Sequence, residues 1–581
     1  MNIRKHFKAF SLFLALTNTI NGFSATGEIT EKLINPVRIV WMSDNTGKYI
    51  QNADELLKDF NGQISVADNK YATLYSKEEH QASILLDFGK EIHGGLKITS
   101  SIREYMNSVN LRIRFGESVT EAMSDVTIAN NPENPTNEHS LRDFNLAAPW
   151  LGSVQCGNTG FRFVRIDLLD KGVEYRLRNV SAISRIRDIE DKGSFQSNNE
   201  RLNQIWNTGA YTVKLNMQEY IWDGIKRDRL VWIGDMHPEV MTINNAFGNH
   251  EVVYRTLDFA RNDTPLPGWM NGMCSYSLWW LIIQKDLYMY QGNLDYLKQQ
   301  QSYIKGLVKQ IDARIDDNGV EHLDGTRFLD WPTSESPEII HSGLQAMSLM
   351  AMEAAAQIGD FLKDDELKQI AQKNIEKLQK VRVGTYGNSQ AAAMSIISGL
   401  SKNNAQDCEV ILKNGVSGFS TFYGYYMLEA LAANGKYKEA MDIISNYWGA
   451  MLDLGGTTFW EDLKYSDVAK SGRIDELVPQ GKYDIHSGGG AYCYKGLRLS
   501  LCHGWASGPT SWMTKHVLGV TPVEPGCKVL EIDPHLGDLT SVKGTFPTPM
   551  GVVSISHKKG TDGKIISDIK APKGVKVRMK K

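Results

Sequence analysis

The sequence has little of several features that would decide its class at once. Its six cysteines form no CxxC pair and show no metal-like spacing, so no metal site is predicted, and a disulfide stays open without being predicted. With 64 basic and 67 acidic residues, the formal net charge of −3 offers no field that would attract nucleic acid or an anionic membrane. No short-period repeat and no low-complexity tract is present. The length of 581 residues predicts roughly two to four globular domains.

Long hydrophobic runs are also missing. Three basic residues among the first eight precede the apolar stretch Ala9–Leu16, which is too short to span a membrane, and small residues follow at Gly22 and Ser24. This pattern predicts a secretory signal peptide over residues 1–25. No cysteine lies near the expected cleavage site, and no later segment has eighteen uninterrupted apolar residues. We therefore expect an exported protein, periplasmic or secreted, with no lipid anchor and no membrane insertion.

What the sequence does contain divides by periodicity. Residues 26–190 alternate apolar and polar positions, with Gly, Asn and Asp between the runs, which is typical of half-buried antiparallel strands. The clearest runs are Ser83–Gly89, Leu96–Ile98, Val109–Phe115 and Phe161–Leu168. They predict an N-terminal β-sandwich domain. The Pro- and Asn-rich segment Asn130–Leu141 is expected to be a long loop.

Residues 191–518 change to a helical period. The expected helices are Leu202–Tyr220, Glu239–Phe247, Glu251–Asn262, Leu278–Met289, Leu294–Ile315, Gly343–Ile358, Asp364–Lys380, Ala391–Leu400, Thr421–Ala433, Tyr437–Trp448 and Leu497–Val517. Consecutive helical hairpins over this length predict an (α/α)6 toroid, with an irregular helical array as the alternative. Either scaffold also serves binding proteins, so the fold alone settles no chemistry.

Strands return in residues 519–581. The runs are Val529–Asp533, Val553–Ser556 and Val575–Met579. They predict a small C-terminal β-sandwich domain.

One short segment concentrates charge. Asp223-Gly-Ile-Lys-Arg-Asp-Arg-Leu-Val-Trp-Ile-Gly-Asp235 holds three acids and three bases, with Trp222 before it and Trp232 within it. A polar, glycine-containing connector between two helices suits functional groups on a rigid scaffold. Taken alone, it is equally a surface loop whose charges pair with one another. The tryptophans and a second acidic segment downstream favour a functional site.

That second segment is Gly455–Asp462, in which Glu461 follows an aromatic pair. Asp330 and Trp331 repeat the pairing of acid and Trp, and His503 lies near Trp505. Glycoside hydrolysis needs two carboxyl groups on opposite sides of the scissile bond, and aromatic faces suit the apolar face of a sugar ring. Any one of these residues could instead be a satisfied core or capping residue.

Four segments have now been singled out: Asp223–Asp235, Asp330–Trp331, Gly455–Asp462 and the region of His503. Together they resemble the α-L-rhamnosidases of glycoside hydrolase family 78, and the resemblance covers almost the whole chain after residue 25. The family's central motif, approximately Asp-x-Pro-x-Arg-Glu-Arg-Leu-Gly-Trp-x-Gly-Asp, aligns with Asp223–Asp235 without a gap. The family's Thr-Thr-x-Trp-Glu matches Thr457–Glu461, its Asp-Trp matches Asp330 and Trp331, and its late His matches His503.

The resemblance implies an inverting exo-glycosidase that releases terminal α-L-rhamnose, or a similar deoxy sugar, from a glycan or glycoside, with no metal or organic cofactor. Asp228 would protonate the glycosidic oxygen, and Glu461 would activate a water on the opposite face. Their carboxyl groups should then lie about 6.5–9.5 Å apart. The expected substrate-binding residues are Asp223, Arg227, Trp232, Asp235, Asp330, Trp331, Trp460 and His503.

Two departures from the family pattern leave alternatives open. Asp228 stands where the family has the longer Glu, and Ile225 and Val231 replace its Pro and Gly. Either Asp228 is the acid of a divergent subgroup, or Glu239 or Asp235 substitutes for it, or the enzyme is weak or acts on another sugar. The rival functions are a different (α/α)6 enzyme, such as an unsaturated glucuronyl hydrolase, and a non-catalytic glycan-binding protein.

Overall fold

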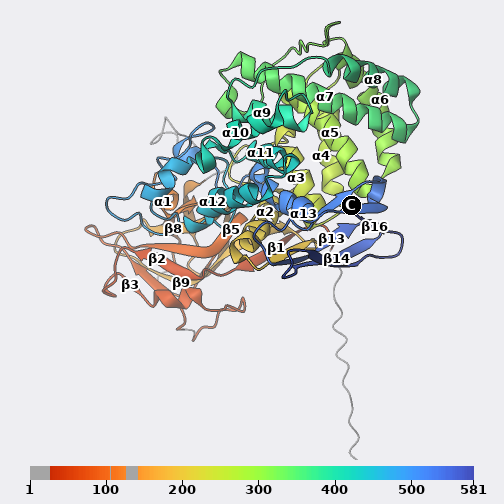
Figure 1. Cartoon of the computed structure of the whole chain (residues 1–581). Helices are drawn as coiled ribbons and strands as arrows, with labels where there is room; N and C mark the ends of the chain where they lie inside the picture. Colours follow the sequence, from red (N-terminus) through yellow and green to blue (C-terminus); the bar gives the residue numbers. More distant parts are fainter. Residues whose placement is uncertain (1–25, 68, 105, 126–141, 581) are drawn as a thin grey trace, which may run out of the picture.

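The computed structural model describes residues 26–67, 69–104, 106–125 and 142–580. A sheet-rich N-terminal region, a helical body and a C-terminal pair of sheets follow one another along the chain (Figure 1). The expected signal peptide and the expected loop Asn130–Leu141 lie outside the described residues. Among the described helices, none combines the length and the apolar composition that a bilayer crossing requires.

The N-terminal region is a nine-stranded sheet in the order β3-β4-β9-β5-β8-β6-β7, with β1 paired to β9 and β2 to β5. The strands are β1 (Ile29–Ile34), β2 (Arg38–Met42), β3 (Ile50–Gln51), β4 (Ala72–Tyr75), β5 (Ser83–Ser100), β6 (Val109–Gly116), β7 (Asp143–Ala148), β8 (Gly152–Leu168) and β9 (Glu174–Arg187). All these pairings are antiparallel. The strands hydrogen-bond into one sheet, which agrees with the sheet-rich domain expected from the sequence, and the expected sandwich packing stays a prediction.

The single sheet results from the long strand β5. The expected segments Ser83–Gly89 and Leu96–Ile98 are two parts of this strand, joined across shifts in register after Asp87 and Gly94. Gly94 has a φ of 146°, and a Cβ there would lie 1.8 Å from the carbonyl oxygen of Ile183. Only glycine permits this close approach, so the strand kinks and continues instead of ending.

Twelve α-helices form the central body. They are α2 (Glu200–Asn216), α3 (Ile233–Ala246), α4 (Glu251–Asp263), α5 (Cys274–Gln291), α6 (Leu294–Asp312), α7 (Pro337–Leu362), α8 (Asp365–Leu378), α9 (Ser389–Ile397), α10 (Asn404–Leu412), α11 (Gly424–Ala433), α12 (Tyr437–Asp453) and α13 (Gly508–His516). Helices α3, α5, α7, α9, α11 and α13 contact one another in a closed series. Every residue of α3 is buried, whereas α8 buries only one side.

The last expected helix, Leu497–Val517, is wrong in its first half. Helix α13 begins only at Gly508, with Pro509 in its first turn, where the missing N–H of proline costs no hydrogen bond. Before it, the backbone N–H groups of Ser500 and Leu501 donate to carboxylates instead of to helical carbonyls. Helix α10 was not expected from the sequence.

The C-terminal region consists of two small sheets. One holds β10 (Ser194–Ser197), β13 (Ser541–Thr548), β14 (Gly551–Lys559) and β15 (Ile565–Lys570), and the other holds β11 (Val520–Pro522), β12 (Val529–Ile532) and β16 (Lys576–Met579). Strand β10 precedes the helical body in sequence yet pairs with β13, so this region takes a strand from far upstream. All six cysteines are free thiols.

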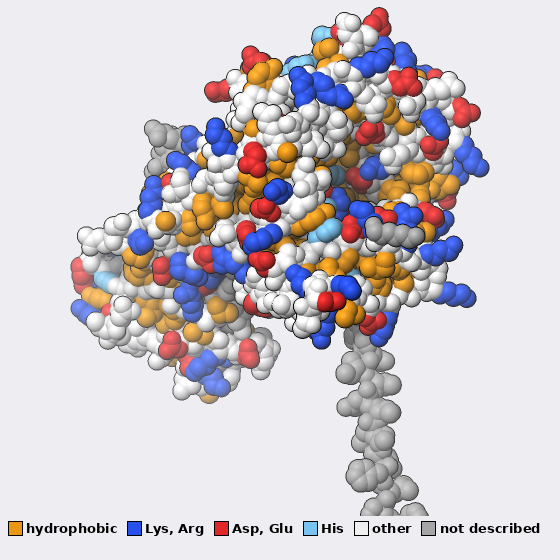
Figure 2. Space-filling model, in the orientation of Figure 1, with side chains coloured by type: hydrophobic (Ala, Val, Ile, Leu, Met, Phe, Trp, Pro, Cys, Tyr) orange, Lys and Arg blue, Asp and Glu red, His pale blue; other side chains and the backbone are white. Residues whose placement is uncertain are grey.

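The molecular surface shows no strong charge bias on the face drawn in Figure 2. Acidic and basic side chains are interspersed there, with apolar side chains between them. This distribution agrees with the small net charge.

Candidate active site

The charged segment predicted from the sequence forms a closed turn after α2, and its last acid, Asp235, lies in the first turn of α3. The Asp223 N–H donates to the carbonyl of Leu230 (3.2 Å), and the Asp223 carboxylate accepts from the Leu230 N–H (3.0 Å). At the end of the turn, Asp228 and Arg229 both have a φ of 54°. A non-glycine residue in this left-handed region costs about 1–3 kcal/mol. The surrounding contacts must therefore hold the turn in place.

Arg227 links the two carboxylates expected to be catalytic. Its Nη1 is 2.8 Å from Asp228 Oδ2, and its Nη2 donates to Glu461 Oε2. Its Nε donates to the carbonyl of Arg498 (2.8 Å), and its guanidinium lies 3.8 Å from the ring centroid of Tyr494. Arg227 is only 1% exposed. One guanidinium thus stands between Asp228 and Glu461 and keeps the two carboxyl groups out of mutual contact.

Three hydrogen-bond donors surround the Glu461 carboxylate. Oε2 accepts from the Ser500 N–H (3.0 Å) in addition to Arg227, and Oε1 accepts from the Cys493 thiol (3.2 Å). Burial raises the pKa of Glu461, but Arg227 and the other donors outweigh it and lower the value to about 2. A carboxylate offers about four acceptor positions. Three donors therefore leave about one acceptor position of the carboxylate unfilled.

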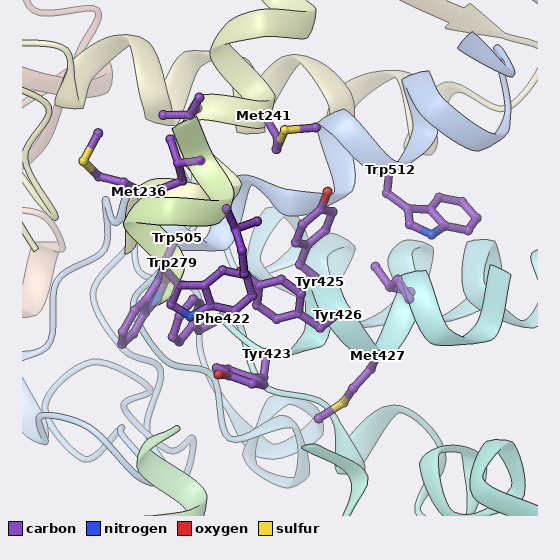
Figure 3. Close-up of a cluster of buried hydrophobic side chains, with 14 of the residues drawn as sticks. Met236, Met241, Trp279, Phe422, Tyr423, Tyr425, Tyr426, Met427, Trp505 and Trp512 are labelled. Atoms are coloured by element: carbon purple, nitrogen blue, oxygen red, sulfur yellow. The ribbon is translucent and has the colours of Figure 1, made fainter. Parts of the chain in front are cut away.

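A cluster of buried aromatic rings (Figure 3) contacts the backbone at Glu461 through Trp505. The Trp505 indole donates to the Glu461 carbonyl (3.0 Å) and stacks on Phe422 at 4.9 Å between ring centroids. Trp279 and Tyr426 stack beside them at 4.7 Å. These packed rings help to fix the backbone at Glu461, because aromatic pairs prefer particular relative orientations in addition to burying apolar area.

Asp223 and Asp235 form a second group of carboxyls near Asp228 and Glu461, and burial favours their protonated forms. His503 Nε2 is 3.0 Å from Asp235 Oδ1, and an isolated backbone bridge joins His503 to Gly224, next to Asp223. Burial raises the pKa of Asp223 to about 8 and also raises the pKa of Asp235. Burial lowers the pKa of His503, yet Glu461 and Asp235 reverse this and leave it raised. These neighbours favour an imidazolium facing carboxyl groups.

Asp228, Glu239 and Asp235 are the three candidates for the acid, and they differ in access: Asp235 is 3% exposed and is held by His503. Glu239 is 1% exposed, and its Oε1 occupies the space that a side chain at residue 504 would need, 1.5 Å from a Cβ built on Gly504. Burial, followed by Asp235 and Asp223, raises the pKa of Glu239 well above its ordinary value. The Asp228 side chain is 13% exposed. A general acid must reach the glycosidic oxygen, so access favours Asp228.

A row of aromatic rings connects two other predicted residues. Trp232 contacts Tyr276 edge-on (6.3 Å between ring centroids), Tyr276 contacts Phe328 (6.3 Å), and Phe328 contacts Trp331 (5.3 Å). Trp331 is 37% exposed. Asp330 caps the turn that carries Trp331, because its Oδ1 accepts from the Trp331 N–H (2.9 Å).

The structure thus brings most of the predicted residues together. Asp223, Arg227, Asp228, Asp235, Glu461 and His503 form one group linked by contacts and mutual charge effects. Trp460 is different: it is 1% exposed, and its indole packs against Gly456, so it belongs to the core under the site. Its predicted contact with a sugar does not fit this position.

Sequence reasoning missed several members of the site. Cys493, Tyr494, Arg498 and Ser500 surround Glu461 and Arg227 from one segment. The run Tyr492-Cys-Tyr494, separated by Ala491 from three consecutive glycines, was the available signal.

A group of metal-ligating residue types lies close by. Glu117, Glu121 and His486 place one ligand atom each within 4.8 Å of one another. The ammonium of Lys226 already lies among them, 3.5 Å from Glu117, 2.8 Å from Glu121 and 3.5 Å from His486. The positive charge that these groups surround is therefore a side chain of the same protein.

Comparison with known proteins gives consistent matches. Residues 190–517 match the family model of the bacterial alpha-L-rhamnosidase 6 hairpin glycosidase domain, and residues 519–580 match that of the bacterial alpha-L-rhamnosidase C-terminal domain. An alpha-L-rhamnosidase of Alteromonas sp. (strain LOR) is 23% identical over 548 residues, which cover 85% of this chain and 55% of the relative. One of Formosa agariphila is 22% identical over 446 residues, 68% of this chain and 45% of the relative. The chain spans about half the length of these relatives.

Solved structures show the same fold. A family GH78 rhamnosidase of Bacillus sp. GL1 superposes with a TM-score of 0.71 at 19% identity, covering 88% of this chain and 54% of that one. A rhamnosidase of Klebsiella oxytoca with rhamnose bound superposes with a TM-score of 0.65 at 18% identity, covering 84% of this chain and 96% of that one.

Proposed function

Since the chain belongs to the family of bacterial alpha-L-rhamnosidases with a 6 hairpin glycosidase domain, we propose that it is an exported inverting exo-glycosidase acting on terminal α-L-rhamnosides. The site lies on an (α/α)6 toroid, as the closed series of contacts among α3, α5, α7, α9, α11 and α13 supports. The observation that carries the proposal is the position of Arg227, which holds Asp228 on one nitrogen and Glu461 on another.

The two carboxyls have opposite tasks in this mechanism. Asp228 gives its proton to the glycosidic oxygen as the bond to the sugar breaks. Glu461, ionised at every working pH because its pKa is about 2, takes a proton from the water that attacks the anomeric carbon. The water enters through the acceptor position that Ser500, Cys493 and Arg227 leave open.

The sugar hydroxyls are assigned to the second group. Asp223 and Asp235 accept or donate hydrogen bonds according to their proton, and His503 orients Asp235. Trp331 and Trp232 supply ring faces for the apolar side of the sugar. The deoxy methyl group of rhamnose suits such an apolar surface. Relatives named alpha-L-rhamnosidase and the rhamnose-bound structure of Klebsiella oxytoca support this choice of sugar.

A panel of aryl glycosides tests the proposal. We expect turnover of the α-L-rhamnoside in preference to other sugars, and proton NMR of the first product should show the anomer opposite to that of the substrate. Retention would mean that a carboxylate attacks the sugar from about 5–5.5 Å, which contradicts the inverting mechanism. Binding of rhamnose without turnover of any glycoside would favour a glycan-binding protein, and turnover of an unsaturated uronide would favour the other rival.

A further inference from the structure

A corner of the N-terminal sheet reaches the segments that carry the catalytic residues. Strand β6 ends at Gly116, and the short helix α1 (Val119–Met123) follows, with Ser118 capping it. Glu117 and Glu121 flank the start of this helix, and both are fully buried. The N-terminal region thus brings two carboxyl groups into the helical body, where an unpaired charge would be costly.

Lys226 is their partner, and it lies directly before Arg227. Its ammonium is 2.8 Å from Glu121 Oε1 and 3.5 Å from Glu117 Oε2, and it donates to the carbonyl oxygens of Leu497 and Leu499. The side chain has no exposed surface. Because four groups from two regions of the chain hold the ammonium, residue 226 cannot shift without breaking buried polar contacts.

Glu117 also contacts the segment that binds Glu461, the expected general base. Glu117 Oε2 accepts from the Leu501 N–H (2.7 Å), and the adjacent Ser500 N–H donates to Glu461 (3.0 Å). Arg142 completes the arrangement, since it lies 2.8 Å from Glu121 and donates to the carbonyl of Gly160 (2.7 Å). The Gly160 N–H in turn donates to the Ile225 carbonyl (3.0 Å), directly before Lys226.

From these contacts we propose that Lys226, held by Glu117 and Glu121 of the N-terminal region, is a positioning residue that sets where Asp228 stands relative to Glu461. The inference rests on the proposed function. Lys226 touches neither the substrate nor the reacting atoms and acts through Arg227. Two residues further on, the turn enters the left-handed conformation of Asp228 and Arg229, which needs a fixed anchor before it.

The charge balance explains why lysine occupies this place. Burial raises the pKa of Glu91 well above its ordinary value and that of Glu117 to about 7. Burial also raises the pKa of Glu121, but Arg142 and then Lys226 bring it down to about 2. Lys226 and Arg142 therefore serve as the two internal cations of this buried group of carboxyls. Of these two cations, Lys226 is the one that lies on the Asp223–Asp235 segment itself.

The test compares two variants. Lys226→Met removes the ammonium and keeps the length of the side chain, so we expect kcat to fall about a hundredfold, as for a displacement of about 1 Å, with a smaller change in KM and a lower Tm. Glu117→Gln/Lys226→Met removes the ammonium together with the carboxyl group 3.5 Å from it and leaves the Arg142–Glu121 pair intact. Its Tm should recover towards the wild type, whereas kcat should stay low.

A matched control is Arg187→Met. Arg187 is also a buried cation between the N-terminal sheet and the chain after α2, since it donates to the carbonyls of Gly27 (2.8 Å) and Gln218 (3.2 Å). We expect this variant to lower Tm and to leave kcat within a few-fold of the wild type. Recovery of kcat together with Tm in the double variant, or full kcat in Lys226→Met, would overturn the positioning role.

Failure of the proposed function is separable from failure of this inference. If the wild type turns over no glycoside, the enzymatic proposal fails, and a crystal structure of Lys226→Met becomes the test. Displacement of residues 225–229 with loss of the Arg227–Glu461 contact would support the positioning role. An unchanged turn with the contact intact would overturn it.

Discussion

Glu461 and Asp223 are two buried carboxyls in one site, and their environments drive them in opposite directions. Both are at most 3% exposed, and burial alone would raise the pKa of each. Glu461 receives Arg227, a backbone N–H and a thiol, and its pKa is lowered to about 2. Asp223 receives one backbone N–H, has Asp235 and Asp228 as neighbours, and its pKa is raised to about 8.

The two carboxyls are buried to a similar extent, so the difference between their pKa values comes from the cations and hydrogen-bond donors around each of them. The region around Glu461 is built to hold a negative charge, which a general base requires. The region around Asp223, Asp235 and Glu239 holds protons instead, because burial raises the pKa of each carboxyl and neighbouring carboxyls raise it further. Arg227 and His503 lie between the two regions and influence both.

The largest expected effect comes from removing the charge of Glu461. We expect Glu461→Gln to lower kcat at least about a hundredfold, because general base assistance is lost, while rhamnose binding remains largely intact. Asp462→Asn is the matched control: it changes the adjacent buried carboxyl, which accepts from Ala491 and Tyr492 N–H groups, and should cost much less. Near-normal turnover by Glu461→Gln on the best wild-type substrate would remove Glu461 from the mechanism.

A smaller, substrate-dependent effect should identify the acid. Asp228→Asn should lose about a hundredfold on glycosides with poor leaving groups and much less on activated aryl glycosides, whose phenolate departs without a proton. Glu461→Gln should show no such difference, since every substrate needs the water. The measurement is kcat/KM across a leaving-group series, with Glu239→Gln alongside. Should the dependence follow Glu239 instead, Asp228 is not the acid.

The smallest effect concerns stability at the proton-holding carboxyl. The pKa of Asp223 is about 8 in the folded protein and 3.8 ordinarily, so ionisation of the unfolded chain makes the wild type lose stability as pH rises from about 4 to 8. Asn has no proton to lose and still accepts from the Leu230 N–H. We therefore expect the Tm of Asp223→Asn, relative to the wild type, to increase between pH 5 and pH 8. A constant Tm difference across this range would mean that the pKa of Asp223 is not raised.

The N-terminal strands show what periodicity predicts well. Val109–Phe115 alternates sharply, and β6 occupies Val109–Gly116. The run Ser83–Gly89 was also correct as strand, but its continuation to Ser100 depends on a kink where the backbone of β9 comes close to Gly94. Alternation reports which side of a strand is buried. It cannot report that two strands are one, because that depends on the neighbours.

Helix prediction failed where the site competes for backbone groups. Residues 497–507 have an apolar spacing that favours a helix, yet Ser500 and Leu501 give their N–H groups to Glu461 and Glu117. Glu117 is almost four hundred residues away in the sequence. No local pattern contains that partner, so the propensity of the segment is overridden by tertiary contacts.

The sequence by itself determined the order of the three regions, the helical period of the middle one, and the motif that places Asp223, Arg227, Asp228 and Asp235 on one connector. These follow from local spacing, which a chain carries wherever it folds. The tertiary structure decided that Arg227 joins Asp228 to Glu461, that Trp460 lies in the core, and that Lys226 is anchored by the N-terminal region. Each of these is a contact between distant residues, and the charge state of a buried group depends on such contacts and not on its neighbours in sequence.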